Sequence, residues 1–530
     1  MENFAAVPEW TEVQQKSGLD PLGLQAASIR LYQALVPGIS NVTLRTRYYG
    51  LYAWLCRDYA IDSNNPDREA LKKIVRRAEA LYALSAAKAI ADGVREGGVA
   101  GVLWAQRKFE ESNDESAIDF SADTHRESGE PQYLRQDWGA FGAAYESQLR
   151  EVGVLGSADA HNVPVPTPLI GEELADAFAH AAGDAGTHFL RSLKSAKASK
   201  KALAEFARLM PWGIHPQSRE RANYERLLFA EYQGATPHDI ARRRTLILAL
   251  RTAKRLGLMP TTEDVRWILY AGGDWNGKAL TFAESELNEH RRKWWAYHAC
   301  DLGRTAYEAL LKWMLDVLET YPGGLSADQL ANAAVDAVDA PSAGWPTSWR
   351  KLVNELPVAN HALSDDDATS EWNLSGEVME AGTGAGKAPV RSAQAAVELL
   401  AVLYRRCNPE RSFLAGQHGG DDANSAARSF ANELAFLEAN EDLSVRDLLT
   451  RIFKERILNR HLWVAMRKLQ YQRDYTFLVE VDDGRLKLRA KDGPVFTNPR
   501  LGPALTFLRD IHLVRVDGLT KRGEELAEAA

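Results

Sequence analysis

Residues 44–59 read LRTRYYGLYAWLCRDY, and their apolar side chains recur with the period of an α-helix. The apolar positions are Leu44, Tyr48, Leu51, Tyr52, Leu55 and Tyr59. This spacing places them on one face of a helix, and a face of this kind must be buried against other elements. The stretch therefore predicts a helix packed into a core, and it sets the pattern for most of the chain.

The same period extends through most of the remaining sequence. It predicts helices at about 67–93, 217–232, 237–256, 279–320, 391–407, 424–439 and 442–470. Apolar and polar residues alternate on both sides of Asp483-Gly484, which predicts a β-hairpin over 475–490. The predicted fold class is therefore mainly α, a multi-domain helical protein with a few short strands.

Two segments, 152–178 and 511–529, share one plan. Each has a short apolar strand, a polar turn and a threonine, followed by G-E-E-L-A at the start of a helix. Thr167 and Thr520 hold corresponding places. This plan is similar to the C-terminal end of winged-helix domains, so we predict winged-helix-like α+β modules at both places. Coincidence between two capped helices is the alternative.

Length and composition predict the domain organisation. A chain of 530 residues is long enough for about three domains. We predict an N-terminal helical domain (1–185) that ends in a winged-helix-like unit, a helical middle domain (186–357), a flexible linker (358–389) and a C-terminal helical region (390–530) with a winged-helix-like DNA-binding module (442–530). The linker is predicted because residues 358–389 are rich in glycine, aspartate and small side chains.

Composition excludes several classes of protein. The chain has 64 Lys and Arg against 72 Asp and Glu, so its net charge is −8 and any nucleic-acid surface must be a local patch. The three cysteines, Cys56, Cys300 and Cys407, are far apart, which argues against a disulfide scaffold or a zinc ribbon. No stretch approaches 18 uninterrupted apolar residues and the N-terminus has no secretory pattern, so we expect a soluble, cytoplasmic protein that does not enter a membrane.

Two motifs are candidates for catalysis, and both are better interpreted as loops. Gly382-Thr-Gly-Ala-Gly386-Lys387 lacks the first glycine and the Ser/Thr of a P-loop. Residues 417–422, QHGGDD, place a histidine beside two carboxylates, but adjacent residues on a Gly-rich turn rarely converge on one ion. Nuclease, hydrolase and zinc-protease signatures do not occur. We predict no catalytic residue, cofactor or metal, and the alternative is a divergent metal-dependent nuclease that uses carboxylates near 480–483 or 418–422.

Basic charge near the C-terminus gives the strongest functional signal. Residues 442–473 contain eight Lys and Arg against three Asp and Glu, a balance of +5 in a chain of net charge −8. Such a helix beside a basic hairpin suits contact with DNA phosphates. The predicted contacts are Arg456, Arg460, Arg467 and Lys468 on the helix and Lys487 and Arg489 on the hairpin. A solvated helix face is the alternative.

The N-terminal segment resembles a family of bacterial proteins. Three motifs carry the resemblance: LDPLGL at 19–24, LVPGIS at 35–40, and RTRYYGLYAW at 45–54. They are similar to the D-x-L-G-[IL] start, the L-x-P-G-x-[ST] break and the T-R-x-R-Y-[FY]-x-x-x-x-W helix of the family. This sequence departs from the pattern where Leu44 separates Thr43 from Arg45. Members of the family are found in anti-phage and restriction-like defence loci beside helicases and nucleases.

The resemblance implies a defence-associated helical protein without assigned catalysis. With the basic C-terminal stretch, it leads to the prediction of a non-catalytic component of a bacterial anti-phage defence system. Such a component would bind DNA and partner proteins such as a helicase, an ATPase or a nuclease, and a purely protein-binding scaffold is a further alternative. Arg45 and Arg47 lie off the apolar stripe, and we expect them to pair with acids such as Asp58 or Asp20 rather than with phosphate.

Overall fold

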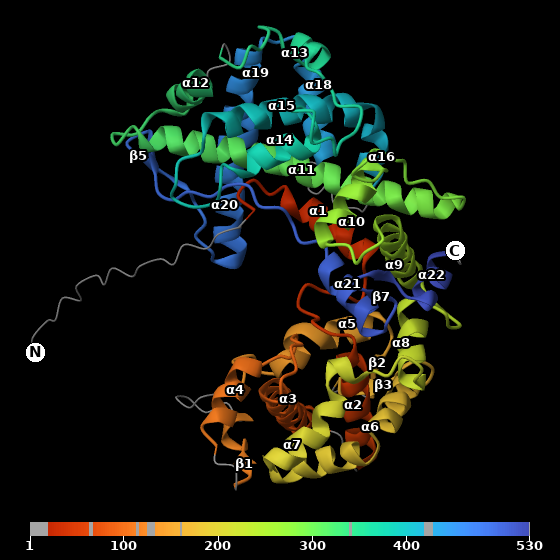
Figure 1. The fold of residues 1–530 in the computed structure, drawn as a ribbon. Helices are drawn as coiled ribbons and strands as arrows, with labels where there is room; N and C mark the ends of the chain where they lie inside the picture. Colours follow the sequence, from red (N-terminus) through yellow and green to blue (C-terminus); the bar gives the residue numbers. More distant parts are fainter. Residues whose placement is uncertain are drawn as a thin grey trace, which may run out of the picture. The chain divides into compact units, whose positions relative to one another are not determined.

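The computed structural model describes residues 20–62, 67–112, 116–124, 133–158, 162–338, 342–417 and 428–528. These residues form a mainly α-helical protein with small two-stranded sheets (Figure 1). The prediction of a mainly α fold is confirmed. In the described ranges, no helix is both long enough and apolar enough to cross a membrane.

The described chain divides into two compact units, each assembled from separate stretches of sequence. Unit 1 contains residues up to Leu31 together with Tyr270–Ala279 and Trp295–Thr497. Unit 2 contains Tyr32–Leu269, Leu280–Trp294 and the residues from Asn498 onward. The predicted boundaries at 185 and 357 do not coincide with this division. Composition marks polar segments, whereas a compact unit depends on which apolar faces meet.

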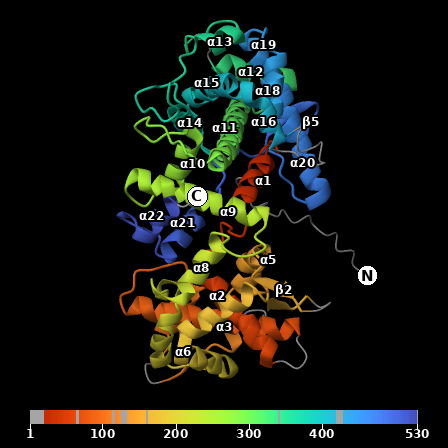
Figure 2. The ribbon, with the colours of Figure 1, turned by 90° about the vertical axis from the view of Figure 1, so that its right-hand side faces the viewer.

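Unit 2 is built around α2 (Arg47–Asp62), the helix of the stretch quoted above. The helices α3 (Arg68–Ala91) and α6 (Gly171–Ser195) contact α2 and lie beside it in both views (Figures 1 and 2). Tyr48 and Tyr52 are buried, and the centroid of the Tyr48 ring lies 4.8 Å from that of Tyr145. The apolar stripe therefore faces a core, as predicted, except for Leu44, which precedes the helix and is exposed.

Several further elements complete unit 2, and their local sequence explains where they begin and end. Helix α9 (Pro237–Leu256) begins with a capping box between Thr236 and Asp239 and ends at the left-handed Gly257. The other helices and strands are α4 (Val102–Glu110), β1 (Ile118–Asp119), α5 (Glu146–Glu151), β2 (Leu155–Ser157), β3 (Pro164–Pro166), β4 (Lys197–Ala198), α7 (Lys200–Phe206), α8 (Arg219–Leu228), α21 (Leu501–Asp510), β7 (Val514–Arg515), β8 (Gly518–Leu519) and α22 (Lys521–Glu528). Strand β1 pairs with β4, β2 with β3, and β7 with β8, all antiparallel.

The two segments with a common plan do share local structure. Each is a hairpin followed by a helix, β2–β3 before α6 and β7–β8 before α22. The hydroxyl of Thr167 accepts from Gly171 N–H, and that of Thr520 accepts from Gly523 N–H, both at 3.2 Å. A Cβ on Gly171 would lie 2.2 Å from the carbonyl oxygen of Val154, and a Cβ on Gly523 would lie 2.1 Å from that of Leu513. The sequence echo therefore reflects one tightly packed local motif, and its assignment to the winged-helix class is not confirmed.

Unit 1 is assembled on α11 (Ser285–Glu319), of which residues from Trp295 onward belong to it. Helix α18 (Phe430–Ala439) packs against α11, where a Cβ on Gly303 would lie 2.2 Å from the ring of Phe430. The other elements are α12 (Ala327–Val338), α13 (Trp349–Glu355), α14 (Glu371–Met379), α15 (Val390–Cys407), α16 (Arg411–Gly416), α19 (Val445–Arg451), the π-helix η6 (Ile452–Leu458), α20 (Asn459–Gln472), β5 (Val479–Asp482) and β6 (Arg485–Leu488). The helices α1 (Gln25–Leu35), α10 (Thr262–Ala271) and α11 contribute residues to both units.

The predicted flexible linker, residues 358–389, is structured. It contains α14, whose Leu374 and Val378 are buried. Its glycine-rich end is also held in place, because Ala388 N–H donates to the buried carboxylate of Asp316 over 2.8 Å. Residues 358–389 therefore contain a packed helix and a hydrogen-bonded end, and their role as a flexible linker between domains stays a prediction. Its small residues predicted exposure to solvent, but the backbone carbonyl oxygens of Ala385 and Gly386 accept hydrogen bonds from the buried side chains of Lys491 and Lys312.

The predicted module 442–530 is not one compact body. Residues 442–497 belong to unit 1 and residues from 498 onward to unit 2. The hairpin β5–β6 forms about Asp483-Gly484 as predicted, with Val479 opposite Leu488 and Asp482 opposite Arg485. It pairs further with Leu325 rather than with β7 or β8. The alternating residues correctly predicted this hairpin, but they could not predict its neighbour, because pairing with Leu325 joins segments that are distant in the sequence.

A candidate nucleic-acid interface on helix α20

One face of α20 is fixed against the turn that begins at Asp20. His461 is buried, and its Nε2 accepts a hydrogen bond from Leu478 N–H over 2.9 Å. The imidazole Nδ1 therefore carries the proton and donates to the carbonyl oxygen of Pro21, 3.2 Å away. Burial lowers the pKa of His461 to about 4, so the ring is neutral near pH 7.

Gly23 makes this close packing possible. Its φ of +68° is in the left-handed region, and a Cβ at this position would lie 2.8 Å from Cγ2 of Val464. One turn further along α20, Nζ of Lys468 donates to the carbonyl oxygen of Asp20 over 3.1 Å. Burial is the main cause that lowers the pKa of Lys468. The N-terminal turn thus holds one side of α20 in a defined position.

A second face of α20 presents aromatic and basic side chains to solvent. Trp463, Arg467 and Tyr471 are spaced four residues apart, which places them on one side of the helix. The guanidinium carbon of Arg467 lies 4.8 Å from the ring centroid of Trp463 and 5.8 Å from that of Tyr471. Trp463 is 45% exposed and Tyr471 is 78% exposed. Among the described residues, no carboxylate forms an ion pair with Arg467. We call Trp463, Arg467 and Tyr471 the α20 stack.

A cavity of about 280 Å³ lies between the α20 stack and the N-terminal turn. Its lining includes Asp20, Gly23, Ala26, Arg428, Trp463, Val464, Arg467, Lys468, Tyr471 and Gln472. The guanidinium carbon of Arg428 lies 5.5 Å from the Trp463 ring centroid, on the same cavity. Three cationic side chains therefore share this space with one carboxylate, that of Asp20, which accepts from Gln25 N–H. The lining of the cavity therefore contains more cationic side chains than carboxylates, and Trp463 and Tyr471 form an aromatic wall.

Two of the predicted DNA contacts, Arg456 and Arg460, are engaged inside unit 1. Both guanidinium groups donate to the carboxylate of Glu433, Arg456 over 2.6 and 2.9 Å and Arg460 over 2.6 Å. The Glu433 side chain is fully buried, and that of Arg460 is only 9% exposed. This geometry favours a structural role, because two arginines compensate one buried carboxylate.

The two predicted contacts on the hairpin, Lys487 and Arg489, are partly exposed, and each is paired with a carboxylate. Lys487 Nζ lies 2.5 Å from the carboxylate of Asp482. Arg489 Nε lies 3.0 Å from Glu480, and its guanidinium carbon is 4.1 Å from the ring centroid of Tyr475. Exposed pairs of this kind are weak, so both cations remain available to a phosphate at little cost.

The structure thus brings Arg467 and Lys468 together in one cavity and adds residues that the sequence analysis missed. Arg428 was missed because it lies on a separate segment before α18. Trp463 and Tyr471 were visible in principle, because their spacing of eight residues with Arg467 midway indicates a shared helix face. Exposure was the missing information: of the tryptophans that the structure describes, only Trp463 is exposed.

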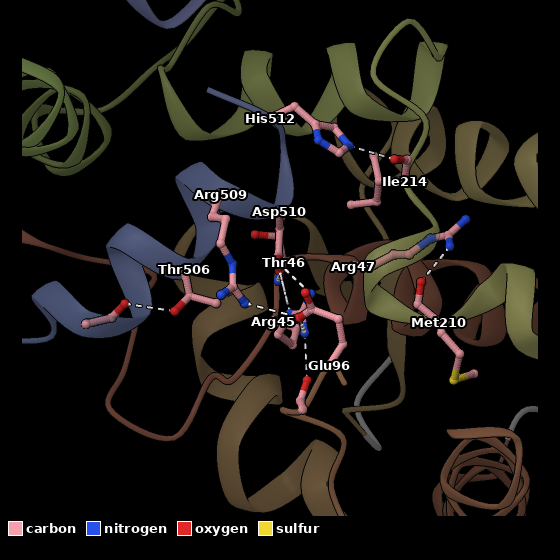
Figure 3. Close-up of polar contacts among 12 residues, drawn as sticks. Arg45, Thr46, Arg47, Glu96, Met210, Ile214, Thr506, Arg509, Asp510 and His512 are labelled. Carbon is pink, nitrogen blue, oxygen red and sulfur yellow. Dashed lines mark hydrogen bonds and ion pairs between the residues drawn. The ribbon is translucent and has the colours of Figure 1, made fainter. Parts of the chain in front are cut away.

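The conspicuous arginines of the N-terminal resemblance are buried in unit 2. Arg45 is paired with Asp510, with Nη2 of Arg45 and Oδ1 of Asp510 2.8 Å apart, and it also contacts Glu96 (Figure 3). Arg47 donates to both oxygens of Glu220, over 2.8 and 2.9 Å, and to the carbonyl oxygen of Met210. The expected structural role is confirmed, but the partners are Asp510 and Glu220 instead of Asp58 or Asp20. Neither guanidinium is accessible to a phosphate, because each side chain is at most 4% exposed.

The hairpin carboxylates proposed for the nuclease alternative, those near 480–483, are engaged in ion pairs rather than gathered at a centre. Glu480 and Asp482 pair with Arg489 and Lys487 on the hairpin. Within the described ranges, no group of three or more His, Cys, Asp or Glu side chains is placed to hold a metal ion. Residues 418–422 lie outside the described residues. The glycine-rich segment before Lys387 borders buried ion pairs, since the carbonyl oxygen of Gly386 accepts from Lys312.

Comparison with protein-family models, curated proteins and solved structures finds no significant match to this chain. The similarity of residues 19–54 to a family from defence loci therefore stays a prediction.

Proposed function

We propose that this protein binds DNA through the cavity beside the α20 stack and acts as a non-catalytic component of a bacterial anti-phage defence system. The single observation that carries DNA binding is the juxtaposition of Arg428, Arg467 and Lys468 with exposed aromatic rings in one cavity. Cations of this kind neutralise phosphates and release counterions, which supplies most of the affinity of proteins for DNA.

The arrangement also explains how an acidic chain can bind a polyanion. The net charge is −8, so the whole surface does not attract DNA. In the cavity, three cations stand against one carboxylate that already accepts a backbone hydrogen bond. Lys487 and Arg489 are proposed as secondary phosphate contacts because both are exposed in part and their ion pairs are weak. Arg456 and Arg460 support α20 through Glu433 in this proposal.

The defence context and the partner proteins depend on the resemblance of residues 19–54. We propose that the partner protein is a helicase, an ATPase or a nuclease. The winged-helix assignment of 152–178 and 442–530 is not required, because the proposed interface lies entirely within unit 1. No arrangement of carboxylates in the described residues favours the nuclease alternative.

The test is the salt dependence of DNA binding by the full chain. Fluorescence anisotropy with labelled single-stranded and duplex oligodeoxynucleotides would be recorded at several KCl concentrations for the wild type and for Arg428→Ala/Arg467→Ala. We expect the variant to bind more weakly and its slope of log K against log salt to be flatter by about 1.4 to 1.8. Absence of salt-dependent binding to either form of DNA would contradict the proposal.

A matched control removes the same charge elsewhere in unit 1. Arg350 and Arg446 are exposed and each pairs with a surface carboxylate, Arg350 with Asp442 and Arg446 with Asp336. Arg446 precedes Arg467 by 21 residues of nearly continuous helix, which corresponds to roughly 30 Å. Arg350→Ala/Arg446→Ala should leave the affinity and the salt slope close to those of the wild type. An equal loss in both double variants would mean that net charge, rather than the cavity, determines binding.

A further inference from the structure

The exposed aromatic residues of unit 1 are concentrated around the C-terminal half of α20. Among the residues that the structure describes, fifteen large hydrophobic side chains are exposed, and five of them lie between residues 463 and 481: Trp463, Met466, Tyr471, Tyr475 and Val481. Apolar side chains exposed together on a surface are typical of binding sites. Figures 1 and 2 both show the C-terminal end of α20 at the edge of unit 1.

The chemistry of this cluster suits bases as well as phosphates. In the α20 stack, Arg467 lies between two rings, and Arg428 lies near Trp463. Planar guanidinium and aromatic groups are the platforms on which unpaired bases stack, and neighbouring cations follow the phosphate backbone. In a duplex the faces of the bases are covered by their neighbours, so a ring on a rigid helix cannot reach them without unstacking the DNA.

We propose that the α20 stack selects single-stranded DNA, with Trp463 and Tyr471 stacking on successive or nearby bases and Arg467 and Arg428 contacting the backbone between them. This inference rests on the proposed function and specifies its substrate. In this proposal Trp463 and Tyr471 contact the bases, and the cationic side chains of the cavity contact the phosphates. Loss of an aromatic ring therefore has a consequence different from loss of a charge.

The experiment compares three ligands of equal length: oligothymidylate, an abasic deoxyribose-phosphate strand and a duplex. The full chain should bind oligothymidylate more tightly than both the abasic strand and the duplex. Trp463→Leu and Tyr471→Leu should each weaken oligothymidylate binding by about five-fold or more, and should leave binding to the abasic strand unchanged. Trp463→Phe should retain most of the affinity, because it keeps an aromatic face that Leu lacks.

Each other outcome is decisive. Equal binding to the duplex and the single strand, with Leu variants that behave as wild type, would overturn single-strand selection but leave salt-dependent DNA binding intact. Binding to none of the three ligands would overturn the proposed function itself. Tighter binding to oligouridylate than to oligothymidylate would assign the surface to RNA, and equal binding to polyglutamate would assign it to an acidic protein. Because Trp463 and Tyr471 are exposed, the variants should remain folded, and circular dichroism verifies this.

Discussion

Arginines occupy opposite environments in the N-terminal motif of unit 2 and on α20 of unit 1. Arg47 is 1% exposed and donates to both oxygens of a carboxylate that is equally buried. Arg467 lies between two exposed rings, and among the described residues no carboxylate pairs with it. A buried arginine that compensates a buried acid contributes to stability, whereas one stacked at the surface retains its charge for a ligand. Burial and the available partners therefore decide the role of an arginine.

The largest loss of stability is expected when the buried ion pair between Arg47 and Glu220 is broken. Arg47→Met should lower the free energy of unfolding by about 3–5 kcal/mol, because Glu220 then remains buried without its counter-charge. Urea denaturation measures this change. The double variant Arg47→Met/Glu220→Leu should recover part of the loss, since no isolated charge remains. A loss below about 1 kcal/mol in the single variant would show that the pair is not a structural requirement.

Arg460 is a buried arginine on the same helix as Arg467. Arg460→Ala should destabilise the protein by about 2 kcal/mol, because a hydrogen bond to the fully buried Glu433 is lost while that of Arg456 remains. Its affinity for DNA should stay within two-fold of the wild type. Thermal unfolding and fluorescence anisotropy on the same preparation check both statements. If Arg460→Ala bound DNA more weakly but was as stable as the wild type, Arg460 would be a DNA contact after all.

The buried face of α20 should respond to acid. Burial lowers the pKa of His461 to about 4, whereas the unfolded chain has an ordinary value near 6.5. The unfolded state therefore binds the proton more readily, and the stabilisation present above pH 6.5 is lost as the pH falls towards 4. Between pH 7 and pH 5 this histidine alone should account for about 2 kcal/mol.

Urea denaturation at both pH values would measure the effect. His461→Leu should remove this part of the pH dependence, although it also destabilises the protein at neutral pH by leaving Leu478 N–H without its acceptor. His290→Leu in unit 2 should remove a separate contribution of the same sign, because burial also lowers the pKa of His290, to about 3. If His461→Leu keeps the full pH dependence of the wild type, the assignment to His461 is wrong.

The smallest effect on stability is expected at the surface. Arg467→Ala should change the free energy of unfolding by less than about 0.5 kcal/mol, because it leaves no buried group without a partner. Differential scanning calorimetry would detect a larger change. If Arg467→Ala lowered the free energy of unfolding as much as Arg47→Met does, Arg467 would have a structural role instead.

The sequence predicted elements better than it predicted their partners. Helix α9 matches its predicted bounds of 237–256 because a capping box and a C-terminal glycine are local signals. The partner of Arg45 is Asp510, 465 residues further along the chain, and no local pattern indicates that distance. The contacts of residues 358–389 could not be predicted for the same reason, since the groups that fix the end of this segment, such as Asp316, lie elsewhere in the sequence.

The candidate site was predictable in part. The local excess of basic residues correctly drew attention to α20, and Arg467 and Lys468 do line its cavity. Net charge could not separate them from Arg456 and Arg460, because that distinction depends on one buried carboxylate, Glu433. The aromatic half of the site depends on exposure, which a sequence does not display: a tryptophan on an amphipathic helix is ordinarily expected in the core.

The most direct test of the central claim is a paired measurement on Arg467→Ala and Arg47→Met. Both the affinity for oligothymidylate and the midpoint of thermal unfolding would be recorded for each variant under one set of conditions. We predict that Arg467→Ala loses affinity at unchanged stability, and that Arg47→Met loses stability while the folded fraction binds as tightly as the wild type. If Arg467→Ala binds oligothymidylate like the wild type, the α20 stack is not a DNA interface and the account is contradicted.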